Sequence, residues 1–294
     1  AAALIITPIA VFAELGGVSS VVAQVREINP GAQDLFGSVG LLGLISLVSW
    51  GLGYAGQPHI LTRFMAIGDP DQLVSARRLA MGWMVLMLAA SVATGFAGLA
   101  YFAQSPLENP ETVFIQLSQV LFNPWVAGII TAAILSAIMS TIDSQLLVCS
   151  SVISEDFYRI FLRPHADSRE LLAVSRLAVV AVALVALVIA TDRESRVLDL
   201  VSYAWAGFGA AFGPVILLSL FLRQMSARAA IAGMLGGAIT VVVWSNLEGG
   251  LFDLYEIVPG FLVSMLLVIA VSRVRPEAAP RVLEEFDSAR ALSL

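Results

Sequence analysis

The chain has 294 residues, of which 59% are hydrophobic and only 13% are charged, and its mean hydropathy is +0.89. This composition is typical of a polytopic helical membrane protein and excludes an ordinary soluble domain. The net charge of −6 leaves no basic surface for nucleic acid. With Cys149 as the only cysteine, neither an intrachain disulfide nor a cysteine-based metal site can form. Nucleophile and phosphate-loop motifs are absent, so we do not expect an enzyme.

Hydrophobic runs follow one another along the chain, and each is long enough to cross a bilayer as a helix. They cover about 1–17, 38–62, 79–103, 125–152, 171–191, 197–222, 227–245 and 256–272. The chain opens directly in the first run, so we expect it to begin inside or just before a transmembrane helix. These runs predict an all-α transmembrane domain over 1–272 and a short charged cytoplasmic tail over 273–294.

Arginine supplies all of the positive charge, and its excess falls on every second loop. The arginine-containing segments hold Arg63, Arg77, Arg78, Arg159, Arg163, Arg169, Arg223, Arg228, Arg273, Arg275 and Arg281. Two of the loops between them carry Glu108, Glu111, Glu248, Asp253 and Glu256 without arginine, and the loop 18–37 balances Arg26 with Glu27 and Asp34. Because positively charged loops stay in the cytoplasm, we expect both chain ends on that side. The turn 192–196, with Arg193 and Arg196, is the exception.

Two of the loops have patterns that predict short helices, with solvated connectors as the commoner alternative for both. Residues 111–122 form an amphipathic pattern, which predicts a helix on the outer surface between Pro110 and Asn123. On the inner side, Ser154 is expected to cap a new helix that runs to about Leu162.

The stretch 128–156 is apolar enough to span, yet its middle carries polar side chains. At about 100° per residue, Ala137, Ser140 and Thr141 share one narrow arc, with Asp143 at its edge. A row of oxygens inside a membrane suits a small hard cation. The alternative is that the hydroxyls bond back to carbonyls of their own helix or join two helices. The intramembrane carboxylate favours the cation site.

A second polar stretch within an apolar run is 47–60, where three glycines and Pro58 loosen a helix at mid-membrane. Such a break is tolerated only where the freed carbonyls are buried in protein or line a cavity. Trp50, Tyr54 and Pro58 recur at four-residue spacing, and Gln57 and His59 add polar groups. This pattern favours a site for a small amphipathic solute, with a glycine-faced packing helix as the alternative. The glycine-rich stretch 201–219 is expected to be either a hinge or a packing helix.

The segments WGLGYAGQPHILTRFMA (50–66), MSTIDSQLLVCSSVISEDFYRIFLR (139–163) and LVSYAWAGFGAAFGPVILLSL (200–220) resemble the sodium:solute symporter family. Within the family they look most like its bacterial proline-transporting members, and the resemblance extends to the arginine-containing tail. It implies a LeuT-type inverted-repeat fold. The chain is then the later part of a full transporter: the last helix of the first repeat, the entire second repeat and two C-terminal helices. The missing N-terminal helices of the same transporter become an expected partner.

The resemblance also implies the roles of individual residues. Sodium is expected at the carbonyl of Ala137 and the hydroxyls of Ser140 and Thr141. The solute is expected at Trp50, Tyr54, Gln57 and Pro58. Asp143 stands where a proline-transporting member of the family has serine, although other family members carry aspartate there, and it is a possible further sodium ligand.

The expected function is therefore sodium-coupled symport of a small solute, with L-proline as the first candidate, in a bacterial inner membrane. Pantothenate and other small organic solutes remain alternatives. A second class of function is a transporter-like sensor domain, which a soluble output module would indicate. An intramembrane enzyme rests only on Asp143 and His59 approaching within hydrogen-bond reach.

Overall fold

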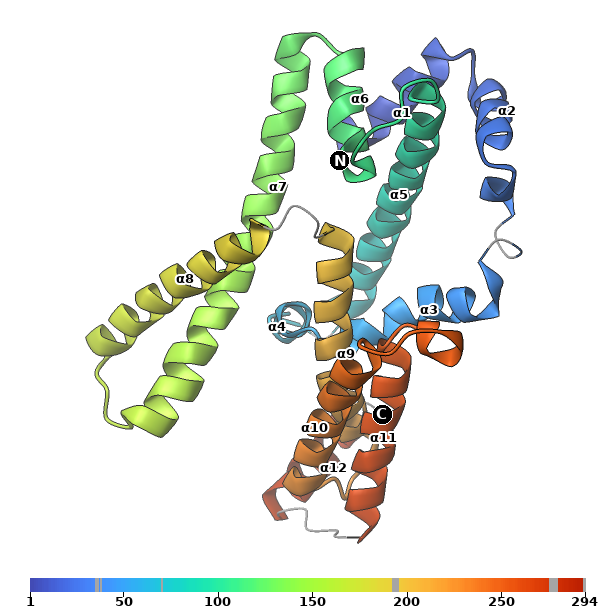
Figure 1. Ribbon diagram of the computed structural model, residues 1–294. Helices are drawn as coiled ribbons and strands as arrows, with labels where there is room; N and C mark the ends of the chain where they lie inside the picture. The colour runs from blue at the N-terminus through green and yellow to red at the C-terminus, as the bar shows by residue number, and fades with distance from the viewer. Residues whose placement is uncertain (35–36, 38, 70, 192–195, 275–279, 293–294) are drawn as a thin grey trace. The chain divides into compact units, whose positions relative to one another are not determined.

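A computed structural model describes the chain except for residues 35–36, 38, 70, 192–195, 275–279 and 293–294, so most of the turn 192–196 lies outside the description. The described part is helical and contains no strand (Figure 1). It divides into two compact units, Ala1–Ser38 with Ile67–Gln145 and Val39–Ala66 with Leu146–Leu294, and each is described by itself.

Within the described residues, six helices are long and apolar enough to cross a membrane. They are Gln72–Tyr101 (α5), Pro124–Leu162 (α7 and its continuation), Ser168–Ala190 (α8), Val197–Phe221 (α9), Ala227–Trp244 (α10) and Ile257–Val274 (α11). The composition and these helices confirm the prediction of an all-α polytopic membrane protein.

One hydrophobic run does not form the single spanning helix that was predicted, and a second is broken where the sequence predicted a break. The run 1–17 forms α1 (Ala2–Glu14), and the chain then bends by 85° into α2 (Val18–Ile28). Gly16 and Gly17 permit this bend because both have positive φ, at 84° and 105°. The run 38–62 forms α3 (Gly40–Gly53), a 3₁₀ turn at Tyr54–Gly56 (η2), and α4 (Pro58–Met65). Its break falls where the glycines and Pro58 predicted it.

The first unit packs α1, α2 and α6 (Val113–Leu121) against α5. Its two small cores consist of Val11, Ala97 and Leu117, and of Val21, Val25 and Ala100. A 3₁₀ turn, η3 (Pro110–Thr112), leads directly into α6. Another 3₁₀ turn, η1 (Pro30–Gln33), follows α2. The helix predicted over 111–122 is therefore confirmed. Its Leu117 is fully buried against α1 and α5, so the apolar face of this helix packs on protein.

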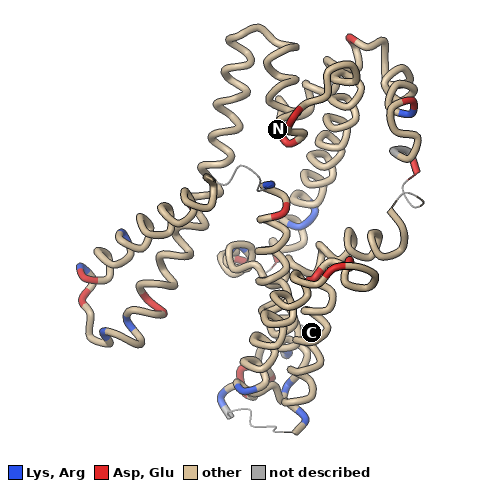
Figure 2. Tube along the Cα trace, in the orientation of Figure 1, with Lys and Arg blue, Asp and Glu red and all other residues tan. Residues whose placement is uncertain are grey.

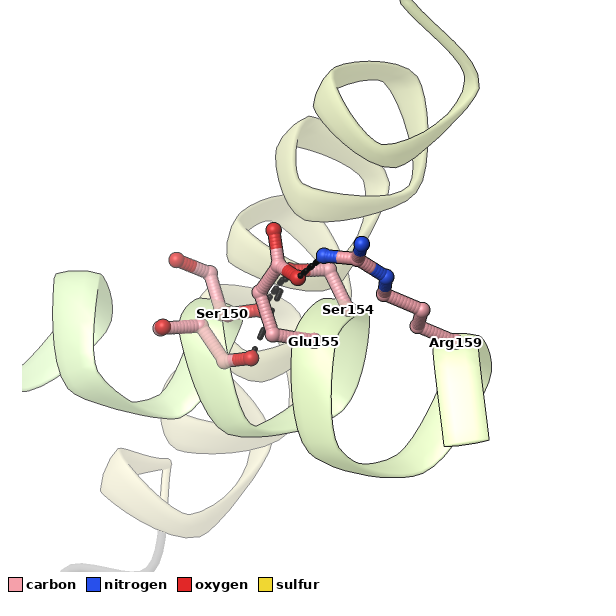
Figure 3. Close-up of polar contacts among 5 residues, drawn as sticks. Ser150, Ser154, Glu155 and Arg159 are labelled. Carbon is pink, nitrogen blue, oxygen red and sulfur yellow. Dashed lines mark hydrogen bonds and ion pairs between the residues drawn. The ribbon is translucent and has the colours of Figure 1, made fainter. Parts of the chain in front are cut away.

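The prediction of a helix start at Ser154 was wrong, because α7 (Pro124–Ser151) continues without interruption as a π-helix over Val152–Leu162 (η4). No glycine or proline interrupts the chain here. The Ser154 hydroxyl bonds backward to the Ser150 carbonyl at 2.7 Å instead of capping a new helix (Figure 3). Glu155 and Arg159 form an ion pair at 3.0 Å one turn further on.

The second unit contains a bundle of α9, α10 and α11, against which α3 and η2 also pack. The bundle has two small clusters of buried residues: Ala206, Ala210, Val241 and Ile257, and Val215, Ala229 and Val268. A 3₁₀ turn, η5 (Gly250–Asp253), connects α10 to α11, and a C-terminal helix α12 (Pro280–Leu292) follows. The described part of that helix is held to the end of α9 by a two-bond ion pair, in which Arg223 donates to Asp287 at 2.9 and 2.7 Å.

Charge separates along this bundle as the loop pattern predicted. Arg223, Arg228 and Arg273 lie at the end where α9 and α11 finish and α10 begins. Glu248, Asp253 and Glu256 lie at the opposite end, in the connection from α10 to α11 (Figure 2). Arg196, just before α9, is the exception that the sequence already indicated.

Glycines bring the backbone of α3 and η2 directly against α9. A Cβ added to Gly209 lies 2.7 Å from the Gly53 Cα and 2.8 Å from the Ile257 side chain. A Cβ on Gly56 meets the Phe208 carbonyl. Because backbone atoms cannot move aside as a flexible side chain can, this crossing tolerates no side chain at these positions.

We predict that Gly209→Ala destabilises the protein by about 1–3 kcal/mol through overpacking. Gly207→Ala is the matched control, because it lies two residues away on α9 and its added Cβ meets nothing within 4 Å. Thermal unfolding of the detergent-solubilised protein, followed by size-exclusion fluorescence, measures both. Equal midpoints for the two variants contradict the close crossing.

Candidate functional site

On α7 the oxygens predicted to bind a cation lie together. The Ser140 hydroxyl donates to the Ala137 carbonyl at 2.9 Å, and the Thr141 hydroxyl donates to the same carbonyl at 3.2 Å. All three residues are exposed. The structure therefore forms the backward hydrogen bonds of the alternative interpretation, and it also brings the three oxygens onto one side of the helix.

The direction of these bonds decides which oxygens remain open to a cation. The Ala137 carbonyl has two lone pairs and, besides both hydroxyls, faces the helical N–H four residues ahead. Its accepting capacity is therefore used. Each hydroxyl donates its proton to the carbonyl and retains two lone pairs, which are directed away from that bond. Ser140 and Thr141 thus present acceptor oxygens at the helix surface.

Asp143 lies on a neighbouring part of the same helix surface. With Ser136 and Ser140 it lines a shallow groove of about 470 Å³, whose other lining residues are Ala132, Leu135 and Met139. Thr141 is not among the lining residues. Ser140 is thus the residue shared between the hydroxyl pair and the groove that holds Asp143.

Two hydrogen bonds connect the residues around the break between α3 and α4 to Trp205 of α9. The Trp50 carbonyl, in the last turn of α3, accepts the indole N–H of Trp205 at 2.9 Å. The amide of Gln57 donates in return to the Trp205 carbonyl at 3.3 Å. Gln57 is only 4% exposed, so its side-chain N–H₂ serves this contact.

Tyr54 is the member of the predicted solute site whose polar group is open. Its ring packs edge-on against Trp205, with centroids 4.9 Å apart, and the residue is 44% exposed. Among the described residues no hydrogen bond to its hydroxyl is formed. Trp50 is half-buried, with its ring centroid 6.1 Å from that of Trp205, and Pro58 is the first residue of α4.

The residue that sequence reasoning missed is Trp205. It lies in the glycine-rich stretch that was interpreted only as a hinge or a packing helix. A signal was present, because an indole N–H within an apolar segment needs an acceptor, and the stretch 47–60 was already expected to offer polar groups. The four predicted solute residues lie in the second unit and the predicted sodium residues in the first, so the structure assembles each set by itself.

The donor set on α7 fits a hard monovalent or alkaline-earth cation better than a transition metal, since it consists of hydroxyl, carbonyl and carboxylate oxygens. A search of the described residues finds no group of three or more His, Cys, Asp and Glu side chains that could hold a metal ion.

Comparison with known proteins agrees with the resemblance seen in the sequence. Residues 1–237 match the model of the sodium:solute symporter family. The high-affinity proline transporter of Bacillus subtilis is 50% identical over 289 residues, which cover 97% of this chain. The sodium/proline symporters of Salmonella typhimurium and Escherichia coli are 48% and 50% identical, over 98% and 92% of this chain.

The alignments cover 61%, 58% and 55% of these three relatives, so the chain spans less than two thirds of their length. Identity near one half over almost the whole chain, together with the family model, leaves no ambiguity about descent. The chain belongs to the sodium:solute symporter family.

Proposed function

We propose that this protein takes part in sodium-coupled symport of L-proline, or of a close relative, across the inner membrane of a bacterium. The observation that carries the proposal is the pair of open hydroxyl oxygens at Ser140 and Thr141 on a helix able to span a membrane. The names of the relatives, which are proline transporters and sodium/proline symporters, support sodium as the coupling ion and proline as the solute.

We further propose a LeuT-type inverted-repeat arrangement, in which 1–272 is transporter domain and 273–294 is a cytoplasmic tail. Because the relatives are longer than this chain, we propose that transport requires helices beyond those present here. In such a carrier the ion and solute sites form where the two repeats meet, near the middle of the membrane.

In the proposed sodium site, Ser140 and Thr141 are the ligands and the Ala137 carbonyl orients them. With both protons drawn to Ala137, the hydroxyl lone pairs are directed toward the ion without a rearrangement of the helix. Ala137 becomes a ligand itself only when one hydroxyl turns away. Asp143 contributes negative charge through the groove that it shares with Ser140.

In the proposed solute site, Tyr54 offers a hydroxyl and an exposed ring face, and Trp50 and Pro58 complete an apolar surface for a pyrrolidine ring. Gln57 acts by holding the break in place through Trp205. Sodium binding then favours the conformation that binds the solute, so that coupling is a difference in affinity between two states.

The function is tested with the full-length transporter in liposomes under an inward sodium gradient. We expect accumulation of labelled proline, collapse of accumulation when potassium replaces sodium, and no accumulation by residues 1–294 alone. Accumulation of pantothenate instead of proline would identify pantothenate as the transported solute. Proline accumulation that is indifferent to sodium would overturn the symport proposal, and binding without any accumulation would favour a sensor.

We predict that Ser140→Ala and Thr141→Ala each weaken the apparent sodium affinity on the order of a hundredfold, because water cannot easily replace a lost ligand oxygen at this depth. Thr131→Ala is the matched control. Thr131 makes the same kind of backward bond, to the Ala127 carbonyl at 2.9 Å, but lies about 120° around the helix from Ala137. Sodium-dependent uptake rates give all three constants, and an unchanged constant in both site variants places the ion elsewhere.

We predict that Tyr54→Phe raises the half-saturating proline concentration about fivefold, the effect of losing one hydrogen bond of about 1 kcal/mol. The ring contact with Trp205 remains, so folding is preserved. Tyr203→Phe serves as control, because Tyr203 of α9 is similarly exposed, at 45%. If both variants match the parent at equal expression, the Tyr54 hydroxyl has no part in solute recognition.

A further inference from the structure

The second unit holds a cavity of about 760 Å³ at the acidic end of the α9–α11 bundle, and neither proposed site accounts for it. Its walls come from α3, the start of α9, and the end of α10 with its connection to α11. The lining residues are Val39, Gly43, Ser46, Leu47, Trp50, Ser202, Trp244, Ser245, Leu247, Phe252, Asp253, Leu254, Tyr255 and Glu256. Tyr54, Gln57 and Pro58 are not among them, so Trp50 alone is shared with the proposed solute site.

Aromatic side chains form two walls of this cavity, and hydrogen bonds hold both in place. Trp50 and Tyr255 stack with ring centroids 5.7 Å apart. The Tyr255 backbone N–H donates to the Ser46 hydroxyl at 3.0 Å, and its phenol donates to the Ser202 carbonyl at 2.6 Å. On the other side, Trp244 packs against Phe252 at 4.8 Å and donates its indole N–H to the Leu254 carbonyl at 2.9 Å. These walls are therefore preorganised and apolar.

The charge of the cavity is negative and uncompensated. Asp253 accepts the backbone N–H of Gly249 at 2.9 Å, which leaves its second oxygen open. Glu256 is half-exposed, and no ion pair or hydrogen bond to its carboxylate occurs in the described part of the chain. No arginine or histidine lines the cavity. Burial, and after it the negative charge of Glu256, raises the pKa of the Tyr255 phenol.

A small organic ammonium ion matches this combination of apolar walls and uncompensated carboxylate. Its methylene groups gain by leaving water against the rings, at about 0.8 kcal/mol for each that is buried. Its N–H groups find the free oxygens of Glu256 and Asp253. A bare metal cation fits less well, because the Ser46 hydroxyl is already engaged as donor to the Leu42 carbonyl and acceptor from Tyr255.

We propose that this cavity is a second binding site, specific for cyclic or alkyl ammonium groups, which captures the ammonium end of the solute independently of sodium. The identification of the occupant as the transported solute rests on the proposed function, whereas the site's preference for an ammonium group does not. Because the site is half-open, its affinity is modest and falls as salt screens the carboxylates.

The test is equilibrium binding to the full-length protein by ligand-observed NMR in sodium-free, low-salt buffer. Pyrrolidine and tetrahydrofuran-2-carboxylate are the probes, since the first keeps only the ammonium group of proline and the second keeps only its carboxylate. We expect pyrrolidine to bind and tetrahydrofuran-2-carboxylate to bind at least about tenfold more weakly. Glu256→Gln should weaken pyrrolidine binding about five- to tenfold and remove most of its salt dependence.

Glu248→Gln is the matched control, because Glu248 lies in the same connection but does not line the cavity. Asp253→Asn is the second variant, in case Glu256→Gln fails to fold. Equal binding of the two probes, or pyrrolidine binding that survives both lining variants, would overturn the proposal. Sodium-driven proline uptake measured on the same protein separates the two claims: uptake without pyrrolidine binding removes only this second site.

Discussion

Two hydrogen bonds tie the segments on either side of the break between α3 and α4 to Trp205 of α9: its indole N–H donates to the Trp50 carbonyl, and its carbonyl accepts from the Gln57 amide. A break in an apolar segment is tolerated where such polar contacts to a neighbouring helix are available, because an unpaired backbone group there costs several kcal/mol. Trp205 can reach these groups because glycines at 53, 56 and 209 allow the two backbones to approach. The positions of Trp50, Tyr54 and Gln57 all depend on that approach, and so does one aromatic wall of the acidic cavity.

The polar groups of α7 also need hydrogen-bond partners within an apolar segment, and they find them in a different way. Its backbone stays helical throughout, and the hydroxyls of Ser140 and Thr141 satisfy their own donors on a carbonyl of the same helix. Such local satisfaction is often taken as evidence against a functional role. Here it fixes the direction of the unused lone pairs, which is the preorganisation that a cation site needs. Hydrogen bonding within the helix and cation binding are therefore compatible interpretations of Ser140 and Thr141.

Periodicity and composition were sufficient to predict the features that depend on a few neighbouring residues. The break at 51–58 followed from its glycines and Pro58, and the arc of Ala137, Ser140 and Thr141 followed from helix geometry alone. Features that depend on distant partners were missed. Gln57 looks like a solute ligand in sequence, but its amide is turned to Trp205, which is 148 residues away along the chain.

Other differences between the prediction and the structure arise where two local backbone conformations lie close in free energy. An uninterrupted run without glycine or proline continues past Ser154 as a π-helix, whereas a serine followed by acidic residues normally predicts a new helix start. The apolar run 1–17 forms only the short helix α1, and after two adjacent glycines the chain continues at 85° as α2, in a segment expected to be a loop. Family resemblance implied the proposed roles at the sodium and solute positions, which spacing alone had left open between binding and packing.

The central claim is that the ion bound at Ser140 and Thr141 and the solute bound near Tyr54 are energetically coupled. Titration calorimetry of the full-length transporter measures this directly, with proline affinity determined with and without sodium, and sodium affinity with and without proline. Linkage requires the two ratios to be equal, and a coupling of about 1–3 kcal/mol corresponds to a ratio of about 5–150. Equal ratios above one that fall to one in Thr141→Ala are the predicted result. A proline affinity that does not change with sodium would contradict the account.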